Sequence, residues 1–173
     1  MAKLVVYWDA SAILSTLFQD AHSAMATHWI GTSHVHLLSS LGRAEVLAVI
    51  ARLGRAKAVG PVLIESAFTA LEKGPWRGIN DNPPAGLLRG LAAAWPLRGA
   101  DLWHLALAKS LQEELPELVL LTFDLRLAEA VAGEGLAPAR GGPPPRLTVR
   151  FPRALARTRR PGARAGRWRG CRL

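Results

Sequence analysis

The sequence contains little cysteine and no long run of apolar residues. Cys171 is the single cysteine among 173 residues, which excludes an intrachain disulfide and a metal cage built from several thiolates. The longest apolar runs, such as LVLL at residues 118–121, are far shorter than the roughly 20 residues that a membrane-spanning helix needs. Residues 3–8 are too few for a signal peptide. We therefore expect a cytoplasmic protein that does not enter a membrane.

Acidic residues are missing from the C-terminal part of the chain. Residues 1–134 contain 13 Asp and Glu against 11 Lys and Arg, a net charge of 11 − 13 = −2, whereas residues 135–173 contain 11 Arg and no acid. The formal net charge of +9 therefore comes from the tail alone. This Arg-, Pro- and Gly-rich tail has too little apolar surface to offset the entropy of ordering it. We predict a folded domain over residues 1–138 and a disordered tail over residues 139–173.

The order of the apolar patterns predicts alternating strands and helices. Strands are expected at residues 4–8, 34–40 and 117–124, with a strand-like segment at 147–151, and helices at residues 11–30, 43–58, 61–73, 87–95, 97–115 and 125–135. Residues 74–86, GPWRGINDNPPAG, are dense in turn formers and are predicted to be a loop. The continuous apolar run at 118–121 is typical of a strand covered on both faces. The pattern thus predicts an α/β fold with a central parallel sheet.

Two of the predicted strands end in an aspartate. Asp9 follows VVYW and Asp124 follows LLTF, and ligands of open parallel sheets bind in the crevice outside the carboxyl ends of the strands. Asp101 lies at the start of a predicted helix, where unpaired N–H groups favour a carboxylate. Glu45 lies near the start of another helix, after the second strand. These four acids are the candidate site residues.

Each of these acids also has a purely structural interpretation. Asp9 and Asp101 could cap helices, Asp124 could end a turn, and Glu45 could belong to a solvated helix face. Asp9 and Asp101, however, stand within the apolar flanks YWDASAIL and GADLWHLAL, where an acid must be compensated for its lost hydration. No arginine of the acidic part of the chain is equally placed, so a bound cation is a good candidate for that compensation.

Gathered in one crevice, four carboxylates would repel each other unless a divalent cation neutralised them. A ligand set made only of oxygen atoms favours Mg²⁺ or Mn²⁺ over zinc. The negative charge left over after one ion could accept a second cation, arriving with a phosphate. Such a site suits hydrolysis of phosphodiester bonds, because the metal activates water and offsets the charge that develops.

The motifs VVYWDASAIL, GRAEVLAVI, LRGADLWHLALA and LLTFDLRLAEAV resemble, in order and spacing, those of the PIN domain family in its small VapC-type ribonuclease toxins. The resemblance covers residues 3–138 and implies a three-layer α/β/α sandwich that cleaves RNA with Mg²⁺ or Mn²⁺. It implies that Asp9 and Asp101 are the main metal ligands, that Glu45 and Asp124 complete the catalytic site, and that Thr122 forms hydrogen bonds within it. It also implies a homodimer and a cognate antitoxin protein that blocks the site.

The histidines and the tail leave other interpretations open. Four of the five histidines lie within 15 residues: His22, His28, His34 and His36. Their spacing matches no common zinc motif. His104, one helical turn after Asp101, could touch the edge of the site or simply pack in the core. The Arg-rich tail is either a passive appendage or the basis of an alternative hypothesis, a non-catalytic nucleic-acid-binding module that neutralises phosphates. A third hypothesis is an inert protein held by an antitoxin-like partner.

Overall fold

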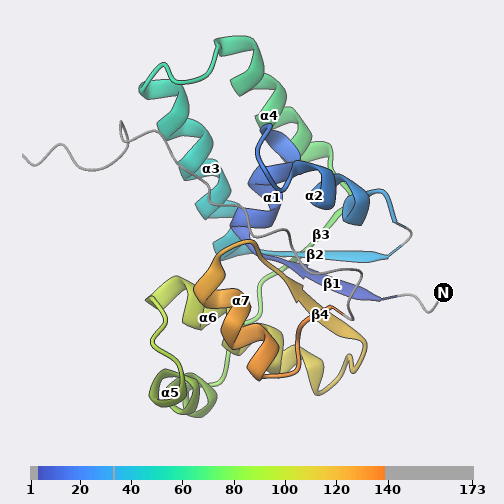
Figure 1. The fold of residues 1–173 in the computed structure, drawn as a ribbon, viewed down its shortest axis with the longest axis vertical. Helices are drawn as coiled ribbons and strands as arrows, with labels where there is room; N and C mark the ends of the chain where they lie inside the picture. Colours follow the sequence, from blue (N-terminus) through green and yellow to red (C-terminus); the bar gives the residue numbers. More distant parts are fainter. Residues whose placement is uncertain (1–3, 33, 139–173) are drawn as a thin grey trace, which may run out of the picture. The chain divides into compact units, whose positions relative to one another are not determined.

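Four apolar segments form one parallel sheet in the computed structural model, which describes residues 4–32 and 34–138. The strands are β1 (Val5–Trp8), β2 (Val35–Ser39), β3 (Trp76–Ile79) and β4 (Leu118–Leu121), in the spatial order β3-β2-β1-β4. All three pairings are parallel, which confirms the predicted central sheet (Figure 1). The predicted disordered tail at residues 139–173, its strand-like segment at 147–151 and Cys171 lie outside the described residues.

Seven helices of the described residues cover the two faces of this sheet. The first face carries α1 (Ala10–Leu17), α2 (Ser23–Ile30), α3 (Ser40–Arg55) and α4 (Pro61–Lys73). The second carries α5 (Ala85–Ala94), α6 (Gly99–Gln112) and α7 (Leu125–Gly133). Because side chains alternate along a strand, Val6 and Trp8 pack under the first group, whereas Val5 and Tyr7 pack under the second. The predicted three-layer α/β/α sandwich is confirmed.

The single helix predicted over residues 11–30 is wrong, because the chain turns between α1 and α2. Asp20 Oδ1 accepts a hydrogen bond from the backbone N–H of His22 at 2.8 Å, and the Ser23 hydroxyl accepts one from the backbone N–H of Asp20 at 2.8 Å. These side chains replace the helical partners of the backbone, as Asp and Ser do in turns. The apolar periodicity continues across the turn because both helices bury residues against the same face.

The loop predicted over residues 74–86 is also wrong in part, because it contains edge strand β3. Trp76 pairs with His36 of β2, and its ring lies 5.2 Å from that of Trp8 in an edge-to-face arrangement. The turn formers around this segment concealed a four-residue strand whose pairing depends on a distant part of the chain. Here tertiary packing overrides local propensity.

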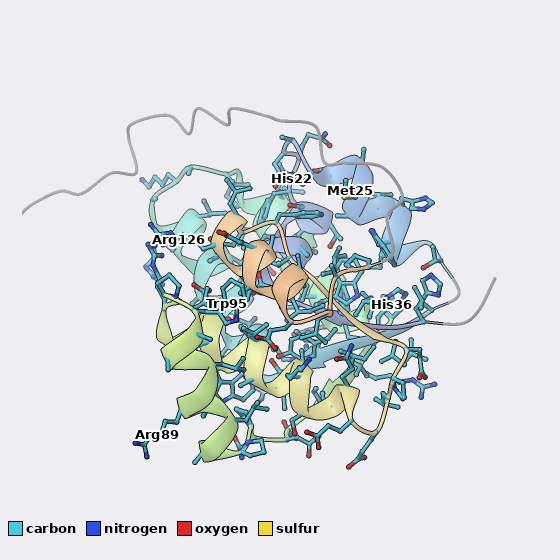
Figure 2. All side chains as sticks on the ribbon, turned by 60° about the horizontal axis from the view of Figure 1, so that its bottom comes forward. His22, Met25, His36, Arg89, Trp95 and Arg126 are labelled. Atoms are coloured by element: carbon cyan, nitrogen blue, oxygen red, sulfur yellow. The ribbon has the colours of Figure 1, made fainter. Side chains whose placement is uncertain are left out.

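Trp95 joins the end of α5 to the end of α7 on the second face (Figure 2). Its indole N–H donates to Glu134 at 2.9 Å. A Cβ atom at Gly133 would lie 2.4 Å from the Trp95 ring, so this position requires glycine. No helix within residues 4–32 and 34–138 is long and apolar enough to span a bilayer.

Candidate metal centre

Asp9 and Thr122 occupy matching positions just beyond the carboxyl ends of two paired strands. In the parallel register of β1 and β4, Trp8 lies opposite Leu121. The backbone N–H of Asp9 donates to the Leu121 carbonyl at 3.0 Å, which extends the pairing by one step. The sheet therefore places the Asp9 carboxylate beside the Thr122 hydroxyl, although 113 positions separate the two residues along the chain.

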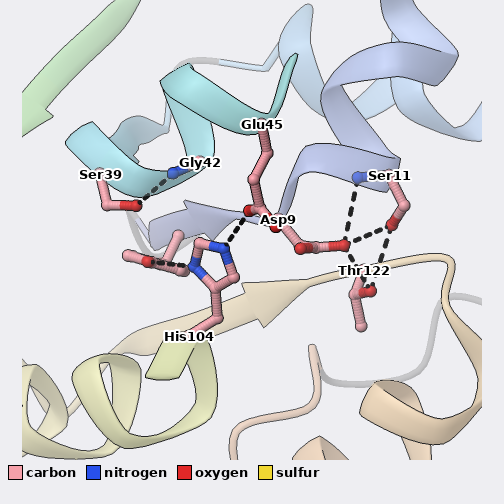
Figure 3. A network of polar contacts seen from close by, with 8 residues as sticks. Asp9, Ser11, Ser39, Gly42, Glu45, His104 and Thr122 are labelled. Atoms are coloured by element: carbon pink, nitrogen blue, oxygen red, sulfur yellow. Dashed lines mark hydrogen bonds and ion pairs between the residues drawn. The ribbon is translucent and has the colours of Figure 1, made fainter. Parts of the chain in front are cut away.

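One oxygen of the buried Asp9 carboxylate receives three hydrogen bonds. Asp9 Oδ2 accepts from the Ser11 backbone N–H at 3.2 Å, from the Ser11 hydroxyl at 2.5 Å and from the Thr122 hydroxyl at 2.9 Å (Figure 3). Asp9 is 6% exposed and also forms the N-cap of α1. No donor among the described residues contacts its other oxygen, Oδ1. The carboxylate is thus anchored on one side and open on the other.

The two hydroxyls that hold Asp9 are themselves fixed by the backbone after β4. The Ser11 hydroxyl accepts from the Phe123 backbone N–H at 2.9 Å, and the Thr122 hydroxyl accepts from the Asp124 backbone N–H at 3.1 Å. Each hydroxyl has a single proton, and each directs it at Asp9. The orientation of the carboxylate is therefore set by the turn that begins α7 as well as by its own helix.

Glu45 is held by a different device. It lies in the second turn of α3, whose first turn is capped by the Ser39 hydroxyl, an acceptor from the Gly42 backbone N–H at 3.0 Å. Glu45 Oε2 lies 2.7 Å from His104 Nε2, and His104 Nδ1 lies 2.7 Å from the Tyr7 hydroxyl. Within the described residues, no protein donor contacts Glu45 Oε1. Figure 3 shows the Asp9 and Glu45 carboxylates facing each other.

Asp101, in the first turn of α6, lies in the electrostatic field of the other three acids. Burial raises the pKa of its carboxyl, and the negative charges of Asp124, Asp9 and Glu45 raise it further, against the opposing charge of Arg98. The charges of acids from three other elements therefore act on Asp101.

Asp124 caps α7 at the exposed edge of that region. Its Oδ1 accepts hydrogen bonds from two backbone N–H groups of the first helical turn, at 2.9 and 3.1 Å. The structural role of Asp124 is therefore that of a helix cap rather than the end of a turn, and its negative charge acts on Asp101. Capping occupies one oxygen of the carboxylate, as the Ser11 and Thr122 donors do for Asp9.

The structure places the predicted residues unequally. Potential ligand atoms of Asp9, Glu45 and His104 all lie within 4.8 Å of one another, and this is the one such group of acids and histidines within residues 4–32 and 34–138. Asp101 and Asp124 lie outside it. His104 is the member that sequence reasoning left undecided. Its spacing of three residues from Asp101 in a helix was the available signal, because such residues share a face.

A comparison with protein-family models matches residues 6–133 to the family described as "PIN domain". The chain belongs to the PIN domain family. The matched segment contains all four predicted acids together with His104, so the resemblance noted from the four motifs is confirmed.

Solved structures share the fold of this PIN domain. PAE2754 from Pyrobaculum aerophilum is 21% identical, with the match covering 73% of this chain and 84% of that one at a TM-score of 0.53. VapC20 from Mycobacterium tuberculosis, described as a sarcin-ricin loop cleaving toxin, is 16% identical, with 72% and 94% covered at a TM-score of 0.50. A search of curated proteins finds no match. At such identities the likeness establishes the fold.

The donor set of this PIN domain fits a hard divalent cation. Asp9 and Glu45 each have one oxygen engaged by protein donors, and their remaining oxygens face a common space. Metal-binding carboxylates are usually oriented in this way by hydrogen bonds from the surrounding protein. Oxygen ligands with room for water suit Mg²⁺ and Mn²⁺. The arrangement can hold a cation.

Proposed function

We propose that this PIN domain is a metal-dependent endoribonuclease that hydrolyses phosphodiester bonds of RNA with Mg²⁺ or Mn²⁺. The observation that carries the proposal is the pair of facing carboxylates, Asp9 and Glu45, each anchored through one oxygen in a domain of the PIN family. Members of this family are generally nucleases. The electrostatic field of Asp101 and Asp124 adds to the attraction for a cation.

The protein's contribution to such a reaction is orientation and charge. Asp9 and Glu45 would hold the cation, and Asp101 and Asp124 would complete the negative site at the N-terminal ends of α6 and α7. Ser11 and Thr122 keep Asp9 from rotating, so that little reorganisation is needed when substrate binds. A bound divalent cation would lower the pKa of a water molecule and offset the charge that develops on the phosphate.

Cleavage of labelled RNA in Mg²⁺, in Mn²⁺ and in EDTA tests this proposal. Asp9→Asn and Asp101→Asn should each reduce the cleavage rate by roughly 1,000-fold or more, because several kcal/mol of charge stabilisation depend on the cation. Asn remains a good helix N-cap, so Asp9→Asn should keep α1 intact. Glu65→Gln, on the exposed side of α4, is the matched control and should cleave normally.

Two outcomes of this assay would contradict the proposal. Cleavage that survives in EDTA would show that the reaction does not need the cation. Cleavage that survives in both aspartate variants, with the fold intact by circular dichroism, would show that these acids are not catalytic. Salt-dependent RNA binding by the wild-type chain without any cleavage would instead favour the alternative of a non-catalytic binding module.

We further propose that the ribonuclease is the toxin of a toxin–antitoxin pair, acting on cytoplasmic RNA. One solved structure with this fold is described as a toxin, and that description supports the idea by analogy alone. Val62 and Leu63, exposed at the start of α4, offer apolar surface for a homodimer or an antitoxin protein.

Expression of the wild-type chain and of Asp9→Asn in the same cells tests the toxin assignment. Growth arrest that requires Asp9, and its relief by the short protein encoded beside the gene, would support it. Light scattering of the purified chain would report whether it forms a dimer. Growth unaffected by a chain that cleaves RNA in vitro would overturn the toxin role while leaving the ribonuclease in place.

A further inference from the structure

His104 connects the candidate metal centre to the centre of the fold. Its side chain is fully buried under the second face of the sheet, on α6. Nδ1 lies 2.7 Å from the hydroxyl of Tyr7, a fully buried residue of β1, and Nε2 lies 2.7 Å from Oε2 of Glu45 on α3. One imidazole therefore bridges a strand and two helices (Figure 3).

The protons along this bridge can be assigned from chemistry. The Glu45 carboxylate can only accept hydrogen bonds, so His104 Nε2, 2.7 Å from Glu45 Oε2, is the donor of this pair. Nε2 therefore carries a proton, and the Tyr7 hydroxyl, 2.7 Å from Nδ1, is placed to donate to the other ring nitrogen. This arrangement gives each nitrogen of the fully buried ring a hydrogen-bond partner. It also makes Nε2 a donor, which prevents it from acting as a metal ligand.

The ring has little freedom to move. A Cβ atom added at Gly42, in the first turn of α3, would lie 3.5 Å from His104 Cε1, so the helix backbone passes close to the ring. Trp103 lies beside it, with ring centroids 5.5 Å apart at 89°. Packing thus fixes the imidazole, and the imidazole in turn limits the rotamers open to Glu45.

We propose that His104 is a positioning residue, oriented by Tyr7, that holds Glu45 with Oε1 turned toward the cation. The inference deepens the proposed function and rests on its metal site. A hydrogen bond from a fixed histidine lowers the entropy that Glu45 loses on binding the ion and keeps its carboxylate aimed at Asp9. His104 contributes through Glu45 and does not touch the metal or the RNA.

Mn²⁺ affinity of the full chain, measured without RNA by titration of the free-ion electron paramagnetic resonance signal, tests the proposal. His104→Leu removes the donor and should weaken Mn²⁺ binding by about 10- to 100-fold. His104→Gln places an amide N–H near the position of Nε2 and should recover most of the affinity. Tyr7→Phe keeps the His104 imidazole but removes the hydroxyl that orients it. The Mn²⁺ affinity of this variant should lie between those of His104→Leu and His104→Gln. Each variant is also melted in EDTA to record its stability separately.

Two controls separate positioning from general damage. His36 is another buried histidine, on β2, where Nδ1 accepts from the Trp8 indole at 3.1 Å (labelled in Figure 2). His36→Leu should lower the melting temperature without changing Mn²⁺ affinity. In the double variant His104→Leu with Glu45→Gln, affinity should be no lower than in Glu45→Gln alone, because one residue acts through the other.

The outcomes distinguish the inference from the proposed function. Wild-type affinity in His104→Leu, or additive losses in the double variant, would overturn the positioning role and leave the metal site standing. Nitrogen modulation from a directly bound imidazole in the pulsed spectrum of wild-type Mn²⁺ protein would overturn it in favour of ligation. No Mn²⁺ binding by the wild-type chain, or full binding by Glu45→Gln, would remove the proposed metal site and this inference with it.

Discussion

The carboxylates of Asp9 and Glu45, on the two sides of the candidate metal centre, are oriented by different sets of hydrogen bonds. Asp9 is 6% exposed, follows directly from β1, and receives three hydrogen bonds on one oxygen. The Glu45 side chain is 32% exposed, projects from a helix, and receives one hydrogen bond from the protein. The first carboxylate is held by three donors from two residues, and the second by one donor on a fully buried ring.

The difference follows from the length of the two side chains. A short aspartate at a strand end has few rotamers, and nearby backbone and hydroxyl groups can reach it. A glutamate has one more rotatable bond, and fixing it costs more conformational entropy. The buried His104 ring, itself held by Tyr7, offsets this entropy through its hydrogen bond to Glu45. The Asp9 side should therefore tolerate the loss of one donor, whereas the Glu45 side should not.

Removing both hydroxyls from the Asp9 side should produce the largest effect. In Ser11→Ala combined with Thr122→Val, only the Ser11 backbone N–H still holds the carboxylate. The backbone N–H groups of Phe123 and Asp124 also lose their acceptors. We expect Mn²⁺ affinity to fall by about 10- to 100-fold, as for His104→Leu. An affinity within twofold of wild type would show that the hydroxyls do not orient Asp9.

Removing one hydroxyl should have a smaller effect and would test the proposed redundancy. Thr122→Val keeps the shape of the side chain and leaves both Ser11 donors on Asp9. The loss of one hydrogen bond corresponds to about 1 kcal/mol, or roughly fivefold in Mn²⁺ affinity. Thr122→Ser restores the hydroxyl and should recover the affinity. If Thr122→Val weakens binding as much as His104→Leu, the contrast between the two sides is wrong.

Replacing Asp101 should stabilise the fold when stability is measured without metal, whereas the preceding substitutions weaken metal binding. Its pKa is raised above 3.8, so the folded chain binds this proton more tightly than the unfolded chain does. The free energy of unfolding therefore loses this contribution as the pH rises above the ordinary carboxyl range. In EDTA near pH 7, Asp101→Asn should melt higher than wild type, and the difference should shrink near pH 4.

Addition of Mn²⁺ supplies the matching control for Asp101. The cation should raise the melting temperature of the wild-type chain more than that of Asp101→Asn, because only the former gains the full ligand set. A melting temperature for Asp101→Asn that is lower than wild type in EDTA would mean that this carboxyl stabilises the fold and that its charge is compensated by the protein.

Asp124 should give the smallest change. Asn can replace Asp as an N-cap, so Asp124→Asn should alter the free energy of unfolding by a few tenths of a kcal/mol, whereas Asp124→Ala should cost about 1 kcal/mol. If Asp124 also serves the metal centre, both variants should weaken Mn²⁺ binding equally. Weaker binding in the alanine variant alone would assign Asp124 to capping and remove it from the site.

The ends of β1 and β4 could be predicted from the sequence, whereas edge strand β3 and the side-chain contacts between distant elements could not. The ends of β1 and β4 could be placed together in advance, because parallel strands end at a common edge of a sheet. β3 was missed because Trp76 becomes a strand residue only when β2 and Trp8 are beside it. His104 was left undecided because its partners, Tyr7 and Glu45, lie 97 and 59 positions away. No local pattern encodes contacts at that range.

The amino-acid order by itself determined the parallel α/β architecture, the family and the acids at the strand ends, because apolar periodicity and motif spacing are local properties. Only the tertiary structure decided which oxygen of each carboxylate is engaged, that Ser11 and Thr122 act together on Asp9, and that His104 bridges Tyr7 and Glu45. These features depend on distances of about 3 Å between side chains of separate elements. Such distances exist only after the layers have packed.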